Sequence, residues 1–383
     1  MTIKTTETTE TTETAGGTQQ RPAAGQRPAA DVAQAPAAEA FAAEPPPTGW
    51  RHRHVLDLDD FSVEEIGTVL DLTERMQEVL ERRIARVPAL RGHTVVNLFY
   101  EPSTRTRASF ELAGKVLGAD VITINTSTSS VQKGESLVDT VRTLQAMGAD
   151  SIVIRHASAG APYLAARHSD ASIVNAGDGA HAHPTQALLD LYTMRSHFGD
   201  LTGKRVAMIG DIAHSRVARS DLWGLTALGA DVVVCGPPTL LPLGLHAAQR
   251  PEHARAALPP VEIETEIERA IEGAHVVMAL RLQSERQEGG LLPSLREYAL
   301  HYQVTAARLA RAHPDHLLMH PGPKNEGVEI ARDVAAGSHS IIEQQVANGV
   351  AVRMALLTLL AHGVEAPTSE QHEPHEPAEV PAS

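Results

Sequence analysis

Residues 94–117 read TVVNLFYEPSTRTRASFELAGKVL, and this stretch sets the fold class. Its first six residues form an apolar run rich in β-branched side chains, which is typical of a buried strand. A polar segment follows at residues 101–107, and Phe110, Leu112 and Leu117 then mark a helical segment. A strand, a polar loop and a helix in this order form one unit of an α/β fold.

The same alternation continues along the chain. Further short apolar runs lie at 121–124, 151–154, 173–175, 205–209, 231–234, 275–279 and 317–319, and helical patterns lie at 135–147, 184–198, 215–228, 263–272 and 340–361. Repeated units of this kind predict parallel sheets. A second series opens at residues 204–205, which places a domain boundary near Gln186. The expected fold class is therefore α/β with two domains, each with a parallel β-sheet flanked by helices.

The length of 383 residues suits two domains with additional tails. Residues 1–50 repeat Thr-Thr-Glu and then become rich in proline and alanine, and residues 363–383 carry His-Glu-Pro repeats. Both compositions predict disorder, because they bury too little apolar surface to offset the entropy of ordering. The single cysteine, Cys235, excludes an intramolecular disulfide and is expected to be a buried thiol.

Charge and hydropathy exclude several classes of partner. The formal net charge of -14 argues against nucleic acid, since phosphate backbones are bound by basic surfaces. No apolar run approaches the ~18 residues that would span a membrane. The first fifty residues lack the apolar segment of a signal peptide, so cytoplasmic residence is the expectation.

Two polar segments follow predicted strands and precede predicted helices. Residues 101–107 place hydroxyls and arginines at a helix start, which suits a phosphate, although an ordinary cap with solvated arginines fits the stretch equally well. In residues 181–186, Pro184 begins a helix. His183 there suits a hydrogen bond to a carbonyl oxygen that becomes negative during attack, whereas a lone histidine is more often structural.

Three later loops also carry polar side chains. Residues 210–220 follow a strand but lack the glycine pattern of a dinucleotide site; Arg216 there suits a carboxylate ligand, or is a surface arginine at a helix start. Arg281 and Gln283 could together bind a small acidic ligand. The two prolines of residues 320–324 predict a stiff loop with carbonyls facing a pocket, the alternative being a simple turn.

Together and in this order, the five segments resemble the aspartate carbamoyltransferases over roughly residues 51–362. The resemblance implies that carbamoyl phosphate binds at Ser103, Thr104, Arg105, Thr106, Arg155, His183, Gln186, Gly322 and Pro323, and L-aspartate at Lys133, Arg216, Arg281 and Gln283. It implies catalytic roles for Arg105, Arg155, His183 and Lys133. No metal and no organic cofactor is expected.

The resemblance also implies a homotrimer in which the neighbouring subunit supplies Ser129 and Lys133 to each site. Regulatory or dihydroorotase-like chains are further partners that the resemblance leaves open. Glu101 with Arg216 and Arg286 matches charge pairs that hold the two domains together. The implied domains are residues 51–184 plus 338–362 for carbamoyl phosphate and residues 185–337 for aspartate.

One residue departs from the family pattern, and three alternative functions compete with this interpretation. Glu326 stands where many relatives carry arginine, which puts a partner contact in doubt but not the pocket. Ornithine carbamoyltransferases share the phosphate segment, but typically carry Cys-Leu-Pro where this chain has residues 321–323. A non-catalytic scaffold is the second rival, which the intact motifs disfavour. The third is a nicotinamide-dependent oxidoreductase, and the missing glycine pattern weakens it.

Overall fold

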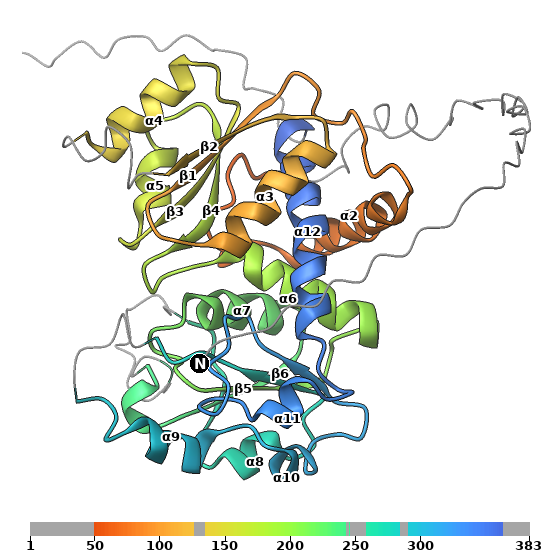
Figure 1. Ribbon diagram of the computed structural model, residues 1–383, viewed down its shortest axis with the longest axis vertical. Coiled ribbons are helices and arrows are strands. Elements are labelled where there is room, and N and C mark those ends of the chain that lie inside the picture. The colour runs from red at the N-terminus through yellow and green to blue at the C-terminus, as the bar shows by residue number, and fades with distance from the viewer. Residues whose placement is uncertain (1–49, 126–134, 243–244, 246–257, 284–289, 363–383) are drawn as a thin grey trace, which may run out of the picture. The chain divides into compact units, whose positions relative to one another are not determined.

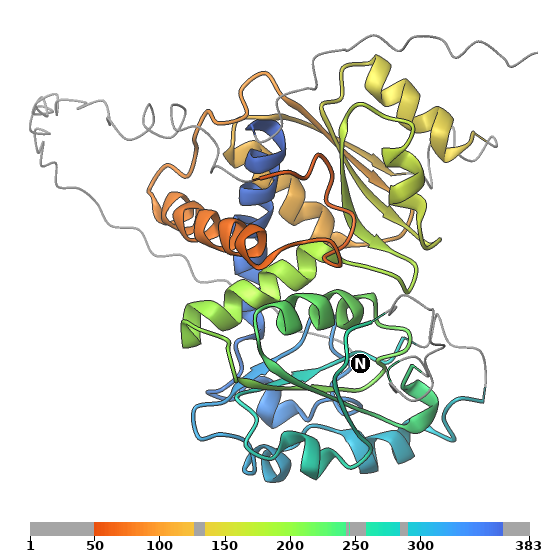
Figure 2. The same cartoon turned by 180° about the vertical axis from the view of Figure 1, so that it is seen from behind.

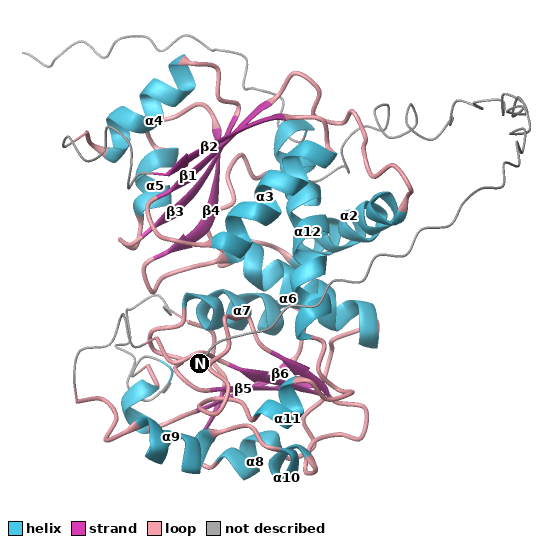
Figure 3. Cartoon of the chain, in the orientation of Figure 1, coloured by secondary structure: helices cyan, strands magenta, loops and turns pink. Residues whose placement is uncertain are grey.

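The computed structural model describes residues 50–125, 135–242, 245, 258–283 and 290–362. Within these ranges the backbone forms two parallel β-sheets, each flanked by helices (Figures 1 and 3), which confirms the predicted fold class. The predicted disordered tails, residues 1–50 and 363–383, lie outside the described residues except for Trp50. That side chain is buried and packs edge-on against Phe61, so Trp50 belongs to the folded core.

The first sheet has the strand order β2-β1-β3-β4. Its members are β1 (Thr94–Phe99), β2 (Asp120–Asn125), β3 (Ser151–His156) and β4 (Ser172–Asp178), and all neighbours pair in parallel. Val95 packs in one hydrophobic cluster and Val96 in another, because helices cover both faces of β1. The carboxyl ends of these strands share one edge, and the polar segment after β1 begins there.

The second sheet has the order β7-β6-β5-β8-β9, again entirely parallel. Its members are β5 (Arg205–Ile209), β6 (Asp231–Cys235), β7 (Glu262–Glu264), β8 (Val276–Ala279) and β9 (Leu317–Met319). Cys235 ends β6 with no exposed surface, which confirms the prediction of a buried thiol.

Helices cover both sheets. They are α2 (Val63–Glu81), α3 (Thr104–Val116), α4 (Leu137–Ala146), α5 (Ala161–Ala166), α6 (Pro184–Phe198), α7 (Arg216–Ala227), α8 (Ile267–Ile271), α9 (Leu295–Tyr302), α10 (Ala306–Leu309), α11 (Arg332–Ala335) and α12 (Ile342–His362), with a 3₁₀ turn η3 (Pro238–Leu240). Helix α2 begins at a capping box, in which Ser62 and Glu65 each accept from the other's backbone N–H. None of the described helices is long and apolar enough to cross a membrane.

Helix α12 connects the two sheets. It follows the last strand of the second sheet in the chain, yet it packs against α2, α3 and α6 (Figures 1 and 2). Most of its residues are buried, and most of the buried ones are apolar, because neighbours surround it on several sides. Its few buried polar side chains, Gln345, Asn348 and Arg353, therefore each need a specific partner.

The predicted strands all exist, with ends that move by up to a few residues, and the predicted helices at 184–198 and 340–361 are confirmed. The helix predicted at 263–272 is wrong in its first part. Residues 262–264 form β7, which pairs with Val233–Cys235 of β6, and the helix spans only Ile267–Ile271. The apolar residues of this stretch satisfied a helical spacing, but pairing with the open edge of β6 determined its start.

Candidate active site

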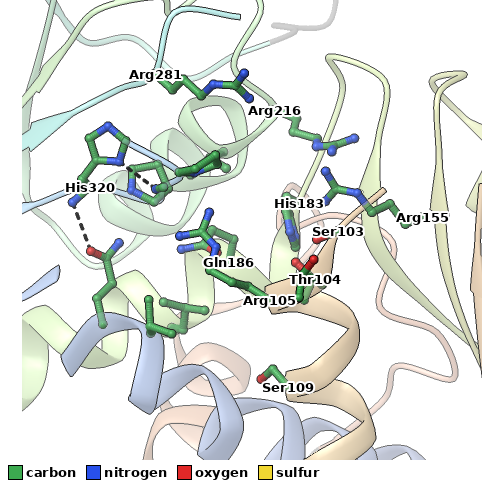
Figure 4. A pocket seen from close by; sticks show the side chains of 18 of the residues that line it. Ser103, Thr104, Arg105, Ser109, Arg155, His183, Gln186, Arg216, Arg281 and His320 are labelled. Carbon is green, nitrogen blue, oxygen red and sulfur yellow. Dashed lines mark hydrogen bonds between the residues drawn. The ribbon is translucent and has the colours of Figure 1, made fainter. Parts of the chain in front are cut away.

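A cavity of about 580 Å³ lies at the carboxyl ends of strands from both sheets. All the predicted site residues that the structure describes line it: Ser103, Thr104, Arg105, Thr106, Arg155, His183, Gln186, Arg216, Arg281, Gln283, Gly322 and Pro323. Figure 4 labels eight of them, whose side chains come from a strand, from loops and from helix starts. The structure thus brings the five sequence segments together at one place.

The start of α3 forms one wall. Ser103 is the N-cap residue, and its hydroxyl makes no capping hydrogen bond to the described helix backbone. The first N–H groups of a helix have no acceptor within the helix, and the positive end of the helix dipole lies there. The arrangement therefore leaves the hydroxyl and backbone donors available to an anion.

Arg105 extends from this helix start toward the second sheet. Its guanidinium reaches Gly322 in the loop after β9, where a Cβ atom would overlap it. Burial and the charge of Arg281 lower the pKa of the Arg105 guanidinium, and a bound anion would offset the repulsion between these cations. Arg105 thereby joins the two halves of the cavity.

Glu101 links two further arginines. Its Oε2 atom lies 3.3 Å from Nε of Arg155 and 2.9 Å from Nη2 of Arg216. Arg155 lies in β3 where the register against β4 shifts, and a bulge of this kind redirects a side chain. Arg216 starts α7 and is 3% exposed, so its ion pair with Glu101 fixes the second sheet's helix to the first sheet's loop.

His183 is held by its backbone. It is the N-cap residue of α6, and its N–H donates to the hydroxyl of Ser220 at 3.0 Å. The Ser220 hydroxyl in turn donates to Asp57 at 2.9 Å. Pro184 occupies the first helical position, where a missing N–H costs nothing. These contacts fix the loop from which the imidazole of His183 lines the cavity.

The loops of the second sheet close the other side. The backbone N–H of Gln283 donates to the buried Asp211 at 3.2 Å, and the N–H of Gly322 donates to Nδ1 of His320 at 2.7 Å. Gly322 has a φ of +61°, and a Cβ atom built on it would overlap the guanidinium of Arg105. Any side chain at residue 322 would therefore force the Arg105 guanidinium to move, which glycine avoids.

Some lining residues were not predicted from the sequence. They include Ser109, Gln345 and Arg353. Arg353 is 4% exposed; its Nη1 donates to Ser109 at 2.7 Å and its guanidinium lies 5.0 Å from the ring centre of Phe110. The available signal was a glutamine and an arginine within an otherwise apolar helix, but that signal does not say where the helix packs.

Three predicted residues, Ser129, Lys133 and Arg286, lie outside the described residues. Within the part of the chain that the structure describes, no cluster of three or more His, Cys, Asp or Glu side chains could hold a metal ion.

The charge of the cavity follows from its lining. Among the described residues of the lining, Arg105, Arg155, Arg216, Arg281 and Arg353 accompany one carboxylate, Glu101. Such an excess of positive charge in a half-buried space attracts small anions. Two parts of the lining, the start of α3 and the loop that carries Arg281, supply donors suited to such anions.

Comparison with known proteins identifies the family. Residues 53–196 match the family described as "Aspartate/ornithine carbamoyltransferase, carbamoyl-P binding domain", and residues 202–360 match its "Asp/Orn binding domain". The aspartate carbamoyltransferase catalytic subunit of Roseiflexus sp. (strain RS-1) is 58% identical over 81% of this chain and 96% of that protein. The corresponding subunit of Dehalococcoides mccartyi (strain CBDB1) is 53% identical over 83% and 94%.

Solved structures of carbamoyltransferases have the same fold as this chain. Aspartate transcarbamoylase from Trypanosoma cruzi, in complex with carbamoyl phosphate and aspartate, has a TM-score of 0.71 at 30% identity and covers 80% of this chain and 95% of that one. Ornithine carbamoyltransferase from Pyrococcus furiosus has a TM-score of 0.72 at 29% identity, covering 82% and 98%. With this fold, cavity and degree of identity, the chain belongs to the aspartate/ornithine carbamoyltransferase family, among the aspartate carbamoyltransferase catalytic subunits.

Proposed function

We propose that this chain transfers the carbamoyl group of carbamoyl phosphate to the amino group of L-aspartate, giving N-carbamoyl-L-aspartate and phosphate. The observation that carries the proposal is that Arg105, at the start of α3, meets the Gly322 loop of the second sheet in the same cavity that Arg281 lines. One anion site thereby adjoins another, as a phosphorylated donor and a dicarboxylate acceptor require. Relatives at 53–58% identity are named aspartate carbamoyltransferase catalytic subunits.

Each half of the cavity has a role in this reaction. Ser103, Thr104 and Thr106 hold the phosphate together with Arg105 and Arg155, while Gly322 and Pro323 contact the carbamoyl group. Arg216, Arg281 and Gln283 hold the carboxylates of aspartate. We assign residues 51–184 plus 338–362 to the donor domain and residues 185–337 to the acceptor domain.

The chemistry proceeds through positioning and charge. The neutral amine of aspartate attacks the carbonyl carbon, and His183 donates a hydrogen bond to the oxygen as negative charge develops. The new C–N bond forms and the C–O bond to phosphate breaks. The departing phosphate accepts the amine proton, because no carboxylate or further histidine among the assigned residues is placed as a base. Orientation of both substrates supplies as much as ~7–11 kcal/mol.

Acceptor choice provides the test. The full-length protein is assayed with carbamoyl phosphate and either L-aspartate or L-ornithine, with Arg105→Ala as the inactive control. Transfer to aspartate alone is expected, because Arg216 and Arg281 favour a dicarboxylate over a cationic amine. Transfer to ornithine, or no transfer at all, would refute the proposal. A basic-limb ionisation lost in the pH–rate profile of His183→Ala would contradict phosphate as the proton acceptor.

The assembly is part of the proposal. We assign the chain to a homotrimer in which Ser129 and Lys133 enter the neighbouring subunit's cavity, within the cytoplasmic pathway of pyrimidine biosynthesis. Mixing an Arg105→Ala protein with a Lys133→Ala protein should then restore activity, because hybrid trimers contain some intact sites. Native mass measurement gives the subunit number and reveals any regulatory or dihydroorotase-like chain. A fully active monomer would refute the shared site.

A further inference from the structure

A buried carboxylate lies beneath the floor of the cavity. Asp190, on α6, has no exposed surface. It accepts a hydrogen bond from Nε2 of Gln186, at 3.1 and 3.3 Å to its two oxygens, and another from Nε2 of Gln345 at 2.6 Å. Gln186 and Gln345 both line the cavity, so one carboxylate holds two side chains that face the substrates.

Asp190 shares its surroundings with a second buried carboxyl. Asp221, on α7, is also without exposed surface, and neither of its oxygens has a hydrogen-bond partner among the described residues. Burial and the charge of Asp190 raise the pKa of Asp221 well above its usual value. Burial raises the pKa of Asp190 to about 8, opposed by the two glutamines and Arg353. The two glutamines and Arg353 favour the charged form of Asp190, whereas no such contact favours the charged form of Asp221 among the described residues.

The hydrogen bonds to Asp190 determine which end of the Gln186 amide faces the cavity. Nε2 of Gln186 lies 3.1 and 3.3 Å from the two Asp190 oxygens, and an ionised carboxylate only accepts hydrogen bonds, so the NH₂ group of Gln186 points toward it. The side-chain oxygen then remains for the cavity. An NH₂ group on a bound substrate finds an acceptor there, whereas the opposite amide orientation would place two donors against each other.

We propose that Asp190 is a positioning residue that fixes the Gln186 amide so that its oxygen accepts from the NH₂ of the carbamoyl group. Asp190 thereby selects a donor that carries NH₂ over one that carries CH₃ at the same place. This inference rests on the proposed function for the identity of the donor.

The same carboxylate reaches the opposite wall through Gln345. The oxygen of Gln345 accepts from the backbone N–H of His320 at 3.1 Å, in the loop that continues to Gly322 (Figure 4). Loss of Asp190 would thus disturb that loop as well. A general loss of order in the site would weaken the binding of every donor ligand alike. The test must therefore compare two ligands that differ only at the NH₂ position.

Acetyl phosphate is that second ligand, because CH₃ replaces NH₂. Without aspartate no transfer takes place, so calorimetry at about pH 9, where Asp190 is ionised, gives equilibrium dissociation constants for both phosphates. The quantity compared is the ratio of the acetyl phosphate constant to the carbamoyl phosphate constant. It does not depend on the fraction of protein that is correctly folded.

In Asp190→Asn, the remaining oxygen keeps its contact with Gln345 at 2.6 Å and the new NH₂ replaces the oxygen that only Gln186 contacts among the described residues. The Gln186 oxygen then turns to accept from that NH₂, so its own NH₂ faces the cavity and the ratio should fall about 10- to 100-fold. Asp221→Asn is the matched control, since it changes a neighbouring buried carboxyl that holds neither glutamine, and should leave the ratio within about twofold. Gln186→Ala should lower the ratio similarly, and adding Asp190→Asn to it should change the ratio no further.

Equal weakening of both phosphates by Asp190→Asn would show a merely structural role and overturn the inference, as would an unchanged ratio. The proposed function is tested separately by carbamoyl transfer to aspartate in the unmodified protein. Its failure would appear there, before any variant is made.

Discussion

Gly322→Ala tests whether the loop after β9 controls the position of Arg105. A Cβ atom at residue 322 would lie 2.7 Å from Cζ of Arg105 and closer still to one terminal nitrogen. The clash involves the far end of a flexible side chain, so it is relieved by moving the guanidinium and not the backbone. Gly273 has a similar φ, +65° against +61°, but no described heavy atom lies within 4 Å of its Cβ position.

The two substitutions therefore have the same backbone cost, but only one of them should weaken the binding of carbamoyl phosphate. Both place alanine in the left-handed region, which costs roughly 1–2 kcal/mol of folding free energy. Only Gly322→Ala displaces Arg105 from the site proposed for phosphate. A charge-assisted hydrogen bond contributes about 1.5–3 kcal/mol, so the dissociation constant for carbamoyl phosphate should rise about 10- to 100-fold.

Chemical unfolding and calorimetric titration of carbamoyl phosphate measure the two effects on each variant. We expect similar losses of unfolding free energy and a loss of affinity in Gly322→Ala alone. Equal affinity of the two variants would show that the approach of Gly322 to Arg105 has no functional consequence, and the reasoning would then be refuted.

Three buried groups give further predictions. Burial raises the pKa of Asp57 to about 6, above its unfolded value of about 4, so the contribution of Asp57 to stability falls as pH rises from about 4 to about 6. Urea unfolding at about pH 4 and pH 7 measures this fall in the free energy of unfolding, and Asp57→Asn should make the fall smaller by up to ~3 kcal/mol. Burial raises the pKa of Cys235 to about 12, so labelling by a thiol reagent at about pH 8 should follow unfolding, and rapid labelling of the folded chain would contradict this. Ser220→Ala removes the acceptor for the His183 backbone and should cost about 1–3 kcal/mol in thermal unfolding while lowering kcat; unchanged kcat would separate this contact from catalysis.

Strand positions and loop chemistry could be predicted from the sequence because both depend on local pattern. An apolar run followed by Ser103, Thr104 and Arg105 shows a strand end and an anion site within a dozen residues. Parallel sheets then place such strand ends at a common edge, which explains why the separate segments converge on one cavity. The start of residues 263–272 was mispredicted because an edge strand depends on a distant partner, β6.

The contributions of α12 could not be predicted, for a related physical reason. Gln345 and Arg353 reach the cavity only because α12 packs between α3 and α6, elements more than a hundred residues earlier in the chain. A glutamine in an apolar helix indicates that a partner exists, but not that the partner is Asp190. Side chains that support other side chains follow from tertiary packing, which no local pattern encodes.

The positive charge of the cavity lining has a cost for the stability of the fold and a benefit for the binding of substrates. Five arginines around one carboxylate repel one another, and burial raises the cost because water no longer screens them. The protein offsets part of this with Glu101 at the surface of the cavity, which pairs with Arg155 and Arg216. Complete neutralisation would remove the attraction for substrates. The two bound anions would supply the remaining negative charge, so the positive excess that weakens the empty fold is the same excess that holds donor and acceptor together.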